Sequence, residues 1–181
     1  MTVFLSFGGR ADDKGLDILL EAAKLLIERK MQFKIRITDG TDTKTTLYKF
    51  FGNTIPNEIE IIPQTENIST YFHKSDWFIS ASRRETFSYA IAESMLSGTP
   101  ILSSDIEGVS WSFKQPSVIT FKSEDAIDLA KKMERIITKK LIVNEQSLII
   151  SRKYVLENYT ADRWAVNLIQ YYDSLCKKEV E

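Results

Sequence analysis

Two carboxylates, Glu85 and Glu93, flank the start of an amphipathic segment in the stretch RETFSYAIAESMLSGTP (84–100). If a helix begins near Ser88, the backbone N–H groups of its first turn have no partner within the helix, and such groups bind anions. Glu93 then projects from the second turn, roughly 7 Å further along the axis. Because each carboxylate can accept hydrogen bonds from a pair of sugar hydroxyls, the spacing predicts a ligand that combines phosphates with hydroxyls.

The rest of the chain alternates short apolar runs with amphipathic runs, which indicates strands and helices in turn. This order predicts an α/β fold, a Rossmann-like doubly wound parallel sheet with further helices at its C-terminal end. In such a sheet the ligand lies beyond the carboxyl ends of the strands. We expect strands at 3–7, 33–38, 58–62, 76–80, 101–103 and 118–121, and helices at 16–29, 43–51, 67–74, 88–97, 126–137, 145–157 and 160–176.

Composition narrows the classes of function. Lysines plus arginines nearly balance aspartates plus glutamates, for a formal charge of −1, which gives no reason to expect a nucleic acid partner. The single cysteine, Cys176, excludes an internal disulfide and fits a reducing compartment. No apolar run approaches the roughly 20 residues needed to span a bilayer. With no signal sequence and no Pro/Gly-rich linker, we expect one cytoplasmic domain over 1–181.

On spacing alone, a solvated residue near a helix start and an ordinary helix glutamate explain this pair better than a site does, but the neighbouring motifs reverse the balance. In register with GR…KG near the first strand, DWFISAS before Glu85 and SGTP after Glu93, the pair resembles the E-x(7)-E motif of retaining glycosyltransferases of group 1 (family 4). The resemblance runs from FGGRADDKG to YTADRWAVNLIQYYDSL. It implies the C-terminal, donor-binding half of a GT-B fold, without the N-terminal acceptor domain that encloses the other side of the active site.

The resemblance implies roles for four side chains. Glu85 would approach the hydroxyls of the donor sugar, and Glu93 would bind the ribose hydroxyls of the nucleotide. Arg10 and Lys14 would bind the diphosphate, whose negative charge grows as it leaves and is stabilised most in the transition state. Because this loop has one residue fewer than is usual in the family, we expect Lys14 to be the less certain of the two. Surface cations paired with Asp12 and Asp13 are the alternative.

Further donor-binding residues follow from the same resemblance. Phe87 and Ser88 replace the commoner Phe-Gly, and we expect them to donate backbone N–H groups, with Ser88 also serving as an N-cap. Gly9 is placed beside the diphosphate, and Pro63 and Gln64 near the nucleotide base. Phe87 could equally be a core residue.

Trp111 occupies the position of an acidic residue that often follows a glycine pair in the family. This departure is compatible with an altered sugar pocket or with relaxed constraint on a chain that no longer catalyses.

Metal chemistry is not expected. One histidine, His73, and one cysteine cannot form a metal cluster, and the DxD metal motif of the other large glycosyltransferase fold is missing. The resemblance therefore implies transfer without cofactor or metal from a UDP- or GDP-linked sugar, with retention, to a saccharide or lipid-linked acceptor. The alternatives are a non-catalytic nucleotide-binding or scaffold module and a fragment of a GT-B sugar-nucleotide 2-epimerase.

Two surfaces suggest contacts beyond the nucleotide sugar. The last helix is expected to pack at the edge of the domain, with Trp164, Leu168 and Tyr172 left partly uncovered and prone to self-association. The predicted helix at 126–137 carries a basic face. We expect this face to be exposed to solvent, and weak peripheral contact with the inner face of a membrane is the alternative. That face consists of Lys131, Lys132, Arg135 and Lys139.

Overall fold

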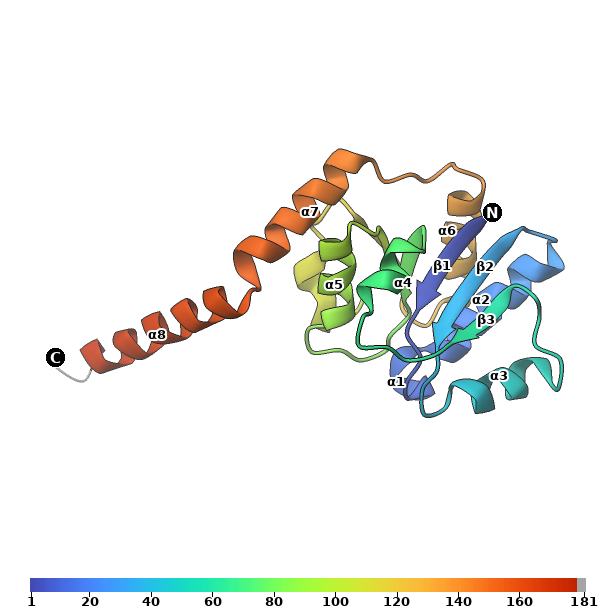
Figure 1. Cartoon of the computed structure of the whole chain (residues 1–181), viewed down its shortest axis with the longest axis horizontal. Coiled ribbons are helices and arrows are strands. Elements are labelled where there is room, and N and C mark those ends of the chain that lie inside the picture. Colours follow the sequence, from blue (N-terminus) through green and yellow to red (C-terminus); the bar gives the residue numbers. More distant parts are fainter. Residues whose placement is uncertain (179–181) are drawn as a thin grey trace.

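The fold is a six-stranded parallel sheet, described over residues 1–178 by a computed structural model (Figure 1). The strand order is β3-β2-β1-β4-β5-β6, the order of doubly wound nucleotide-binding domains. The predicted α/β fold class is therefore confirmed. The strands are β1 (Thr2–Ser6), β2 (Phe33–Thr38), β3 (Ile59–Ile62), β4 (Trp77–Ser80), β5 (Ile101–Ser104) and β6 (Val118–Phe121).

Helices cover both faces of the sheet. Helices α2, α3 and α6 pack on one face, and α4, α5 and α7 pack on the other (Figure 1). The helices are α1 (Ala11–Lys14), α2 (Leu16–Glu28), α3 (Thr43–Phe51), α4 (Ser69–His73), α5 (Tyr89–Ser97), α6 (Ala126–Ile137), α7 (Glu145–Asn158) and α8 (Ala161–Lys178), with a short 3₁₀ helix, η1 (Glu107–Ser112), after β5.

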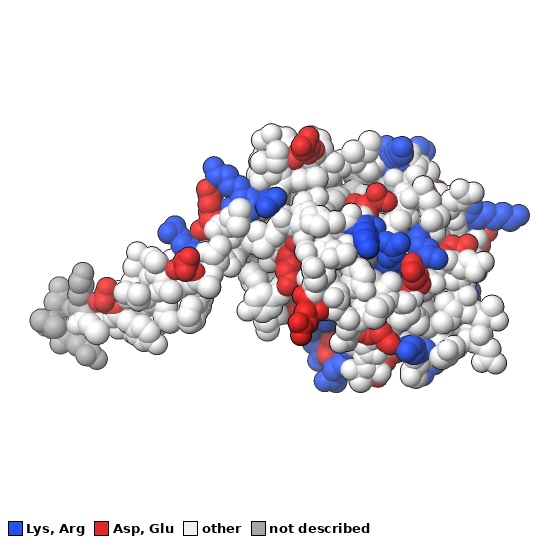
Figure 2. Space-filling model, viewed as in Figure 1, with Lys and Arg blue, Asp and Glu red and all other residues white. Residues whose placement is uncertain are grey.

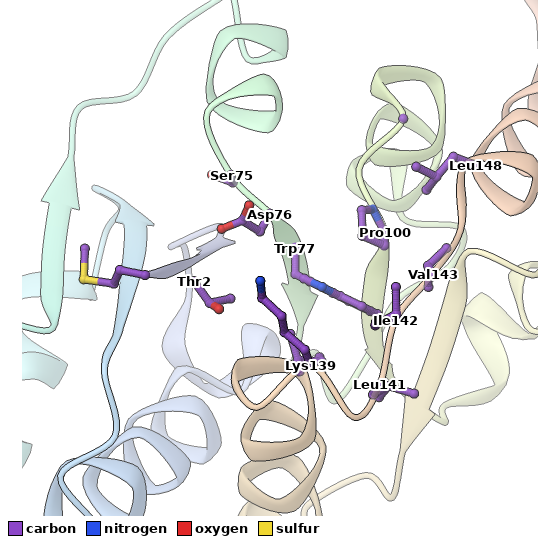
Figure 3. Close-up of a pocket in the computed structure, with 13 residues that line it drawn as sticks. Thr2, Ser75, Asp76, Trp77, Pro100, Lys139, Leu141, Ile142, Val143 and Leu148 are labelled. Carbon is purple, nitrogen blue, oxygen red and sulfur yellow. The ribbon is translucent and has the colours of Figure 1, made fainter.

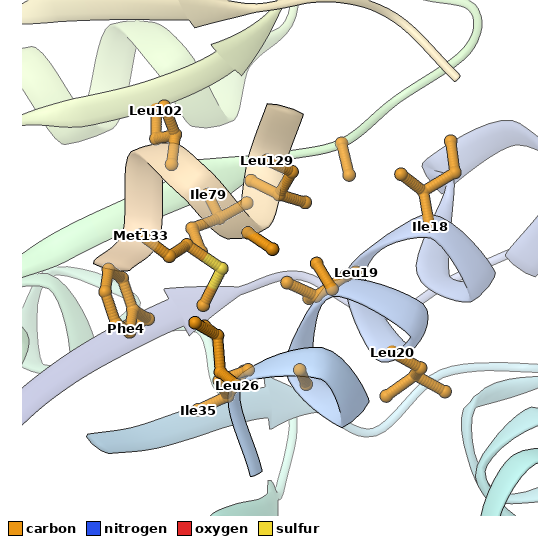
Figure 4. Packing of buried hydrophobic residues seen from close by; sticks show 14 of the residues in the cluster. Phe4, Ile18, Leu19, Leu20, Leu26, Ile35, Ile79, Leu102, Leu129 and Met133 are labelled. Atoms are coloured by element: carbon orange, nitrogen blue, oxygen red, sulfur yellow. The ribbon is translucent and has the colours of Figure 1, made fainter. Parts of the chain in front are cut away.

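The core is split by the sheet because successive side chains of a strand point to opposite faces. Phe4 of β1 and Ile79 of β4 join the cluster under α2 and α6, whereas Leu5 and Phe78 join the cluster under α5. Figure 4 shows the first cluster, in which Leu19 and Leu26 of α2 and Leu129 and Met133 of α6 meet over the strands. Both layers therefore anchor the central strands from which the site loops emerge.

The central pair of strands creates the crevice. β1 pairs with β2 on one side and β4 on the other, all in parallel. The chain leaves β1 toward β2 and leaves β4 toward β5, so the two following loops separate at this point and open a crevice at the carboxyl edge. The loop 7–15 and the loop 81–88 line it.

Two short elements were not predicted. The four-residue helix α1 lies in the loop that we expected to be a turn, and η1 replaces the loop expected around Trp111. Segments this short carry too few periodic positions to be recognised, whereas 33–38, 43–51, 118–121 and 126–137 match the expected bounds.

The last helix differs most from expectation. It was expected to pack at the edge of the domain, but α8 projects away from the body and contacts it only near its start (Figure 1). Trp164 and Tyr172 are 66% and 58% exposed. In the space-filling view this arm is largely uncharged, while charges of both signs are scattered over the body (Figure 2). The expectation of edge packing is wrong: Trp164 and Tyr172 of the apolar stripe are left exposed among residues 1–178, whereas Leu168 is half-buried.

Because α8 makes so few contacts with the sheet, its side chains should contribute little to stability. We predict that Tyr172→Ala, at an exposed position of α8, changes the free energy of unfolding by less than about 0.5 kcal/mol. The matched control, Leu19→Ala in the core, should cost about 3 kcal/mol and lower the melting temperature by about 6 °C or more. Thermal unfolding of dilute samples measures both, and an equal loss would show that α8 packs on the body.

Candidate functional site

Two side chains from separate loops meet at the crevice. The Lys14 amine at the end of α1 lies 2.6 Å from Oε1 of Glu85, which follows β4. The Ser82 hydroxyl donates to the same oxygen at 2.9 Å. Glu85 is the more enclosed partner, with 13% of its side chain exposed against 37% for Lys14. A cavity of about 20 Å³ lies beneath the pair, and Ser88 also lines it. The structure thus joins three of the predicted residues at one cavity.

Glycines allow these loops to approach so closely. A Cβ on Gly15, where φ is 60°, would lie 2.0 Å from the Ala81 carbonyl oxygen, so the α1–α2 junction abuts the end of β4. A Cβ on Gly108 would lie 1.7 Å from the Glu85 carbonyl oxygen, so η1 supports the glutamate from behind. Side chains at either position would force the Lys14 and Glu85 loops apart.

The start of α5 presents free donors to the crevice, as predicted. The N–H groups of Phe87, Ser88, Tyr89 and Ala90 donate to no acceptor within residues 1–178. Ser88 is the N-cap residue, but its hydroxyl makes no capping hydrogen bond. The predicted side-chain cap is therefore wrong, because φ of 64° at Ser88 directs its side chain away from the first turn. Backbone donors alone form the anion site here.

Glu93 is placed one turn further along α5. Its carboxylate is partly buried, and burial raises its pKa because no cation lies near enough to offset the lost hydration. A partly buried carboxylate without a counter-charge is costly unless it serves a ligand. Glu93 does not line the small cavity at Glu85, so the structure does not bring the two glutamates together there.

Arg10 lies outside this cavity. Three quarters of its side chain is exposed, and it pairs with Asp13 at 3.4 Å. Arg84 reaches the same aspartate at 2.5 Å. We expected Arg10 to be better placed than Lys14, and the structure reverses that order: the shortened loop winds into α1 and carries Lys14 to Glu85, while Arg10 remains at the surface.

Gly9, Pro63 and Gln64 lie at the same edge of the sheet. The N–H of Gly9 donates to no acceptor among the described residues, and Gly40 is so close that a Cβ on it would lie 2.5 Å from the Gly9 nitrogen. Pro63 and Gln64 line a shallow hollow after β2 and β3, where the Gln64 amide donates to the Asp39 carbonyl at 2.7 Å.

Arg83 is a site residue that sequence reasoning missed. Its guanidinium donates to both oxygens of Asp17 at 2.8 and 2.6 Å and to Glu124 at 2.6 Å, and its backbone N–H bonds the Asp13 carbonyl at 2.8 Å. The Arg83 hydrogen bond lowers the pKa of Asp17. These contacts tie the Lys14 loop to the Glu85 loop. Partners up to 71 positions away leave no local signal, although adjacent arginines before a glutamate are a hint.

Trp111 takes no part in the Glu85 cavity. Its indole N–H donates to the Phe87 carbonyl at 2.7 Å, and its ring stacks on Phe87 with centroids 4.7 Å apart. Tyr159 packs against it at 4.8 Å. Burial, followed by a hydrogen bond with Tyr154, raises the pKa of Tyr159 to about 12. The position of the family acid is thus filled by an aromatic cluster at the start of α5.

A second hollow, of about 590 Å³, lies beside the start of α5, between Phe87 and Tyr89 and the α7–α8 junction at Tyr159 and Trp164. Residues 1–178 contain no group of three metal-ligating side chains, and none of the helices they form is long and apolar enough to cross a bilayer. A hollow of about 600 Å³ lies beside Trp77, Pro100 and Lys139 (Figure 3). These residues begin β4 and β5 or follow α6, so the hollow is at the amino edge of the sheet, opposite the crevice.

Strand order and crevice define the class of this protein: a Rossmann-like domain of the kind that forms half of a GT-B glycosyltransferase. The sequence matches the family model "Glycosyl transferases group 1" over residues 2–155. The chain belongs to that family.

Known proteins agree with this assignment. The O-antigen biosynthesis glycosyltransferase WbnH of Escherichia coli is 26% identical over 136 residues, which cover 75% of this chain and 39% of WbnH. A glycosyltransferase from Rickettsia africae superposes with a TM-score of 0.80 at 18% identity, covering 98% of this chain and 48% of that one. Anabaena HepE, solved with UDP-glucose, gives 0.77 at 14% identity, covering 95% and 48%. The chain thus spans less than half of each.

Arg83 should stabilise the site loops measurably. Arg83→Met keeps the aliphatic stem but removes every charged contact, and should cost about 1–2 kcal/mol, or about 2–6 °C in melting temperature. Arg84→Met is the matched control, since Arg84 is 75% exposed and should change stability by less than about 0.5 kcal/mol.

The ion pair between Arg83 and Asp17 should make the stability of the protein depend on pH, with a sign that the lowered pKa of Asp17 fixes. Because the pKa of Asp17 is lowered on folding, its ion pair stabilises above the ordinary aspartate pKa and is lost as pH falls through the lowered value. The gap in melting temperature between wild type and Arg83→Met should therefore narrow below about pH 4. A gap that stays constant down to pH 2.5 would contradict the role given to Asp17.

Proposed function

We propose that this chain is the donor-binding domain of a glycosyltransferase and that it binds a nucleoside diphosphate sugar at the crevice. One observation carries the proposal: the Lys14–Glu85 pair stands next to four unpaired N–H donors at the start of α5. Donors and a cation suit a diphosphate, and a carboxylate suits sugar hydroxyls. The structure of HepE with UDP-glucose, a protein of the same fold, supports this ligand class, and UDP- or GDP-linked sugars are its candidates.

Ligand binding would exchange partners within the pair. A diphosphate oxygen that accepts from the Lys14 amine replaces the Glu85 carboxylate, which is then free to accept from hydroxyls of the sugar. The N–H groups of Ser88 and its neighbours take the remaining diphosphate charge, and Arg10 exchanges Asp13 for the diphosphate and binds it from the surface. Glu93 accepts from the ribose hydroxyls, which supply the partner that its carboxylate lacks.

Transfer itself follows from the same groups. The bond between the anomeric carbon and the diphosphate oxygen breaks, and the charge that develops on the leaving group is stabilised by Lys14 and the helix start. This arrangement needs no metal ion, and we propose retention at the anomeric carbon as in the family that the chain resembles. The oxygen of an acceptor hydroxyl forms the new bond to the anomeric carbon and gives its proton to the leaving diphosphate or to a base. The acceptor site is proposed to lie in the other half of the enzyme, so the chain by itself should bind donor without efficient transfer.

The names of relatives guide the proposal for the acceptor. WbnH acts in O-antigen biosynthesis by its name, which supports a saccharide or lipid-linked acceptor here. The apolar face of α8 is where an N-terminal acceptor domain would pack. Peripheral membrane contact through Lys131, Arg135 and Lys139, all exposed on or after α6, stays a prediction that sedimentation with anionic vesicles would test.

Two alternatives differ in their ligands or products. A scaffold module would bind no nucleotide, and a sugar-nucleotide 2-epimerase would convert the donor without any acceptor. Calorimetric titration with UDP-, GDP- and ADP-sugars in the presence of EDTA tests the proposal directly. Micromolar binding of one nucleotide class without metal supports it, whereas binding of none contradicts it.

The two glutamates should separate in their effects on binding. Glu93→Gln should weaken UDP affinity about 10-fold, because the ribose loses a charged acceptor. Glu85→Gln should leave the affinity for UDP unchanged or up to about 3-fold tighter, because Lys14 no longer has to break an ion pair in order to bind the diphosphate. The same variant should bind a UDP-sugar no more tightly than UDP, because the sugar hydroxyls lose their carboxylate acceptor.

The raised pKa of Glu93 adds a pH signature to that comparison. UDP affinity of the wild type should fall as pH drops through the raised pKa, above the ordinary glutamate value of about 4.5, and Glu93→Gln should lack this loss. If the wild type and Glu93→Gln lost the same amount of UDP affinity as the pH falls, the role assigned to Glu93 would be contradicted.

The exposed face of α8 should make the chain self-associate. We predict a mass that rises with concentration in light scattering after size exclusion, and a monomer for Tyr172→Glu, at a side chain that is 58% exposed, with an unchanged melting temperature. Gln170→Glu, at an exposed position on the opposite side of the helix, is the control and should associate like the wild type. A wild type that is monomeric at high concentration would count against this surface.

A further inference from the structure

The peptide that enters α5 is held from one side by Trp111. The indole N–H donates to the Phe87 carbonyl at 2.7 Å, and the two rings lie nearly parallel, 11° apart with centroids at 4.7 Å. Tyr159 packs on the Trp111 ring at 4.8 Å and Tyr154 at 6.5 Å. With both its ring and its N–H engaged, Trp111 fixes the direction of that carbonyl.

Fixing the Phe87 carbonyl also fixes the N–H of Ser88. The two groups belong to one planar trans peptide, in which C=O and N–H point in opposite directions. The carbonyl points toward Trp111, so the N–H points away from it, on the side where Ser88 lines the Glu85 cavity. This N–H is one of the four free donors at the start of α5.

Ser88 is in a backbone conformation that its own chemistry does not favour. Its φ is 64° and ψ is 87°, in the left-handed region where a Cβ is crowded and glycine is free. The residue is 8% exposed, and its hydroxyl makes no capping bond that would compensate. Without an external restraint, rotation to negative φ would turn the Ser88 peptide and its N–H away from the crevice.

We infer that Trp111 is a positioning residue that aims the Ser88 N–H at the diphosphate of the donor. Trp111 and Ser88 act as one unit: the indole restrains a residue that a glycine would let adopt the same conformation unaided. The inference rests on the proposed function for the identity of the ligand but not for the geometry. Trp111 touches no part of the Glu85 cavity, so it acts only through Phe87.

A role limited to packing makes different predictions. Trp111→Phe keeps an aromatic ring on Phe87 and Tyr159 but removes the N–H donor. If Trp111 serves only packing, this variant loses some stability and binds UDP as well as the wild type, whatever residue stands at position 88. If Trp111 aims the donor, the loss appears in affinity and depends on that residue.

The test is a double-mutant cycle on Trp111→Phe and Ser88→Gly, with UDP affinity measured by calorimetry well below the melting temperatures. We expect Trp111→Phe to weaken UDP binding about 5- to 10-fold with serine at position 88 and less than about 2-fold with glycine there. Tyr154→Phe is the matched control. It removes the hydroxyl contact with Tyr159 in the same cluster, and UDP affinity should stay within about 2-fold of wild type. Equal effects of Trp111→Phe in both backgrounds would overturn the inference.

A second measurement separates this inference from the proposed function. Backbone chemical shifts of Ser88 report whether the residue is left-handed, and they are read without any nucleotide. We expect a left-handed Ser88 in the wild type and in Tyr154→Phe, and its loss in Trp111→Phe. If the wild type binds neither UDP nor GDP, the proposed function fails while the shifts still decide the role of Trp111. Retention of the left-handed shifts in Trp111→Phe would refute that role.

Discussion

The site depends on one ion pair that joins loops 71 positions apart in the sequence. Lys14 and Glu85 can meet only because β1 and β4 are neighbours and their chains turn away in opposite directions, which leaves their loops facing each other across the crevice. The pair spans the place where a diphosphate and a sugar would be joined. Each residue holds the other in position, and each is a group that the donor could take over.

Close approach of the backbone is the second requirement. Gly15 presses the Lys14 loop against Ala81, and Gly108 presses η1 against Glu85, so no side chain separates these segments. Arg83 then ties the loops together through Asp17 and Glu124. Glu93 differs from Lys14, Glu85 and Arg83 in making no ion pair within residues 1–178, and burial raises the pKa of its carboxylate. Burying the Glu93 carboxylate without a partner costs stability, and Glu93 is the residue to which the ribose hydroxyls are proposed to donate.

Much of the fold could be predicted from the sequence because its signals are local. The stripe of α6 and its Asp125 cap, which accepts from the Asp128 N–H, lie within a few residues of one another. The free N–H groups before α5 follow from any helix start. The direction of a side chain on a loop is harder to predict. Whether Arg10 or Lys14 reaches Glu85 depends on the helical turn α1, and four residues are too few for a sequence pattern to predict that turn. Arg83 and the projection of α8 depend on contacts, made or missing, that no neighbouring residue encodes.

The two departures from the family pattern explain each other. Serine in place of glycine before α5 introduces strain, and tryptophan in place of an acid supplies the hydrogen bond that restrains the strained peptide. Taken singly, each change suggests a site that has lost its function, since Ser88 places a side chain on a left-handed backbone and Trp111 replaces a charged residue. Taken together, they keep the donors of the helix start directed at the crevice while leaving its charge to Lys14, Glu85 and Glu93. Because relaxed constraint gives no reason for two changes to compensate, the pair favours a site that is still in use.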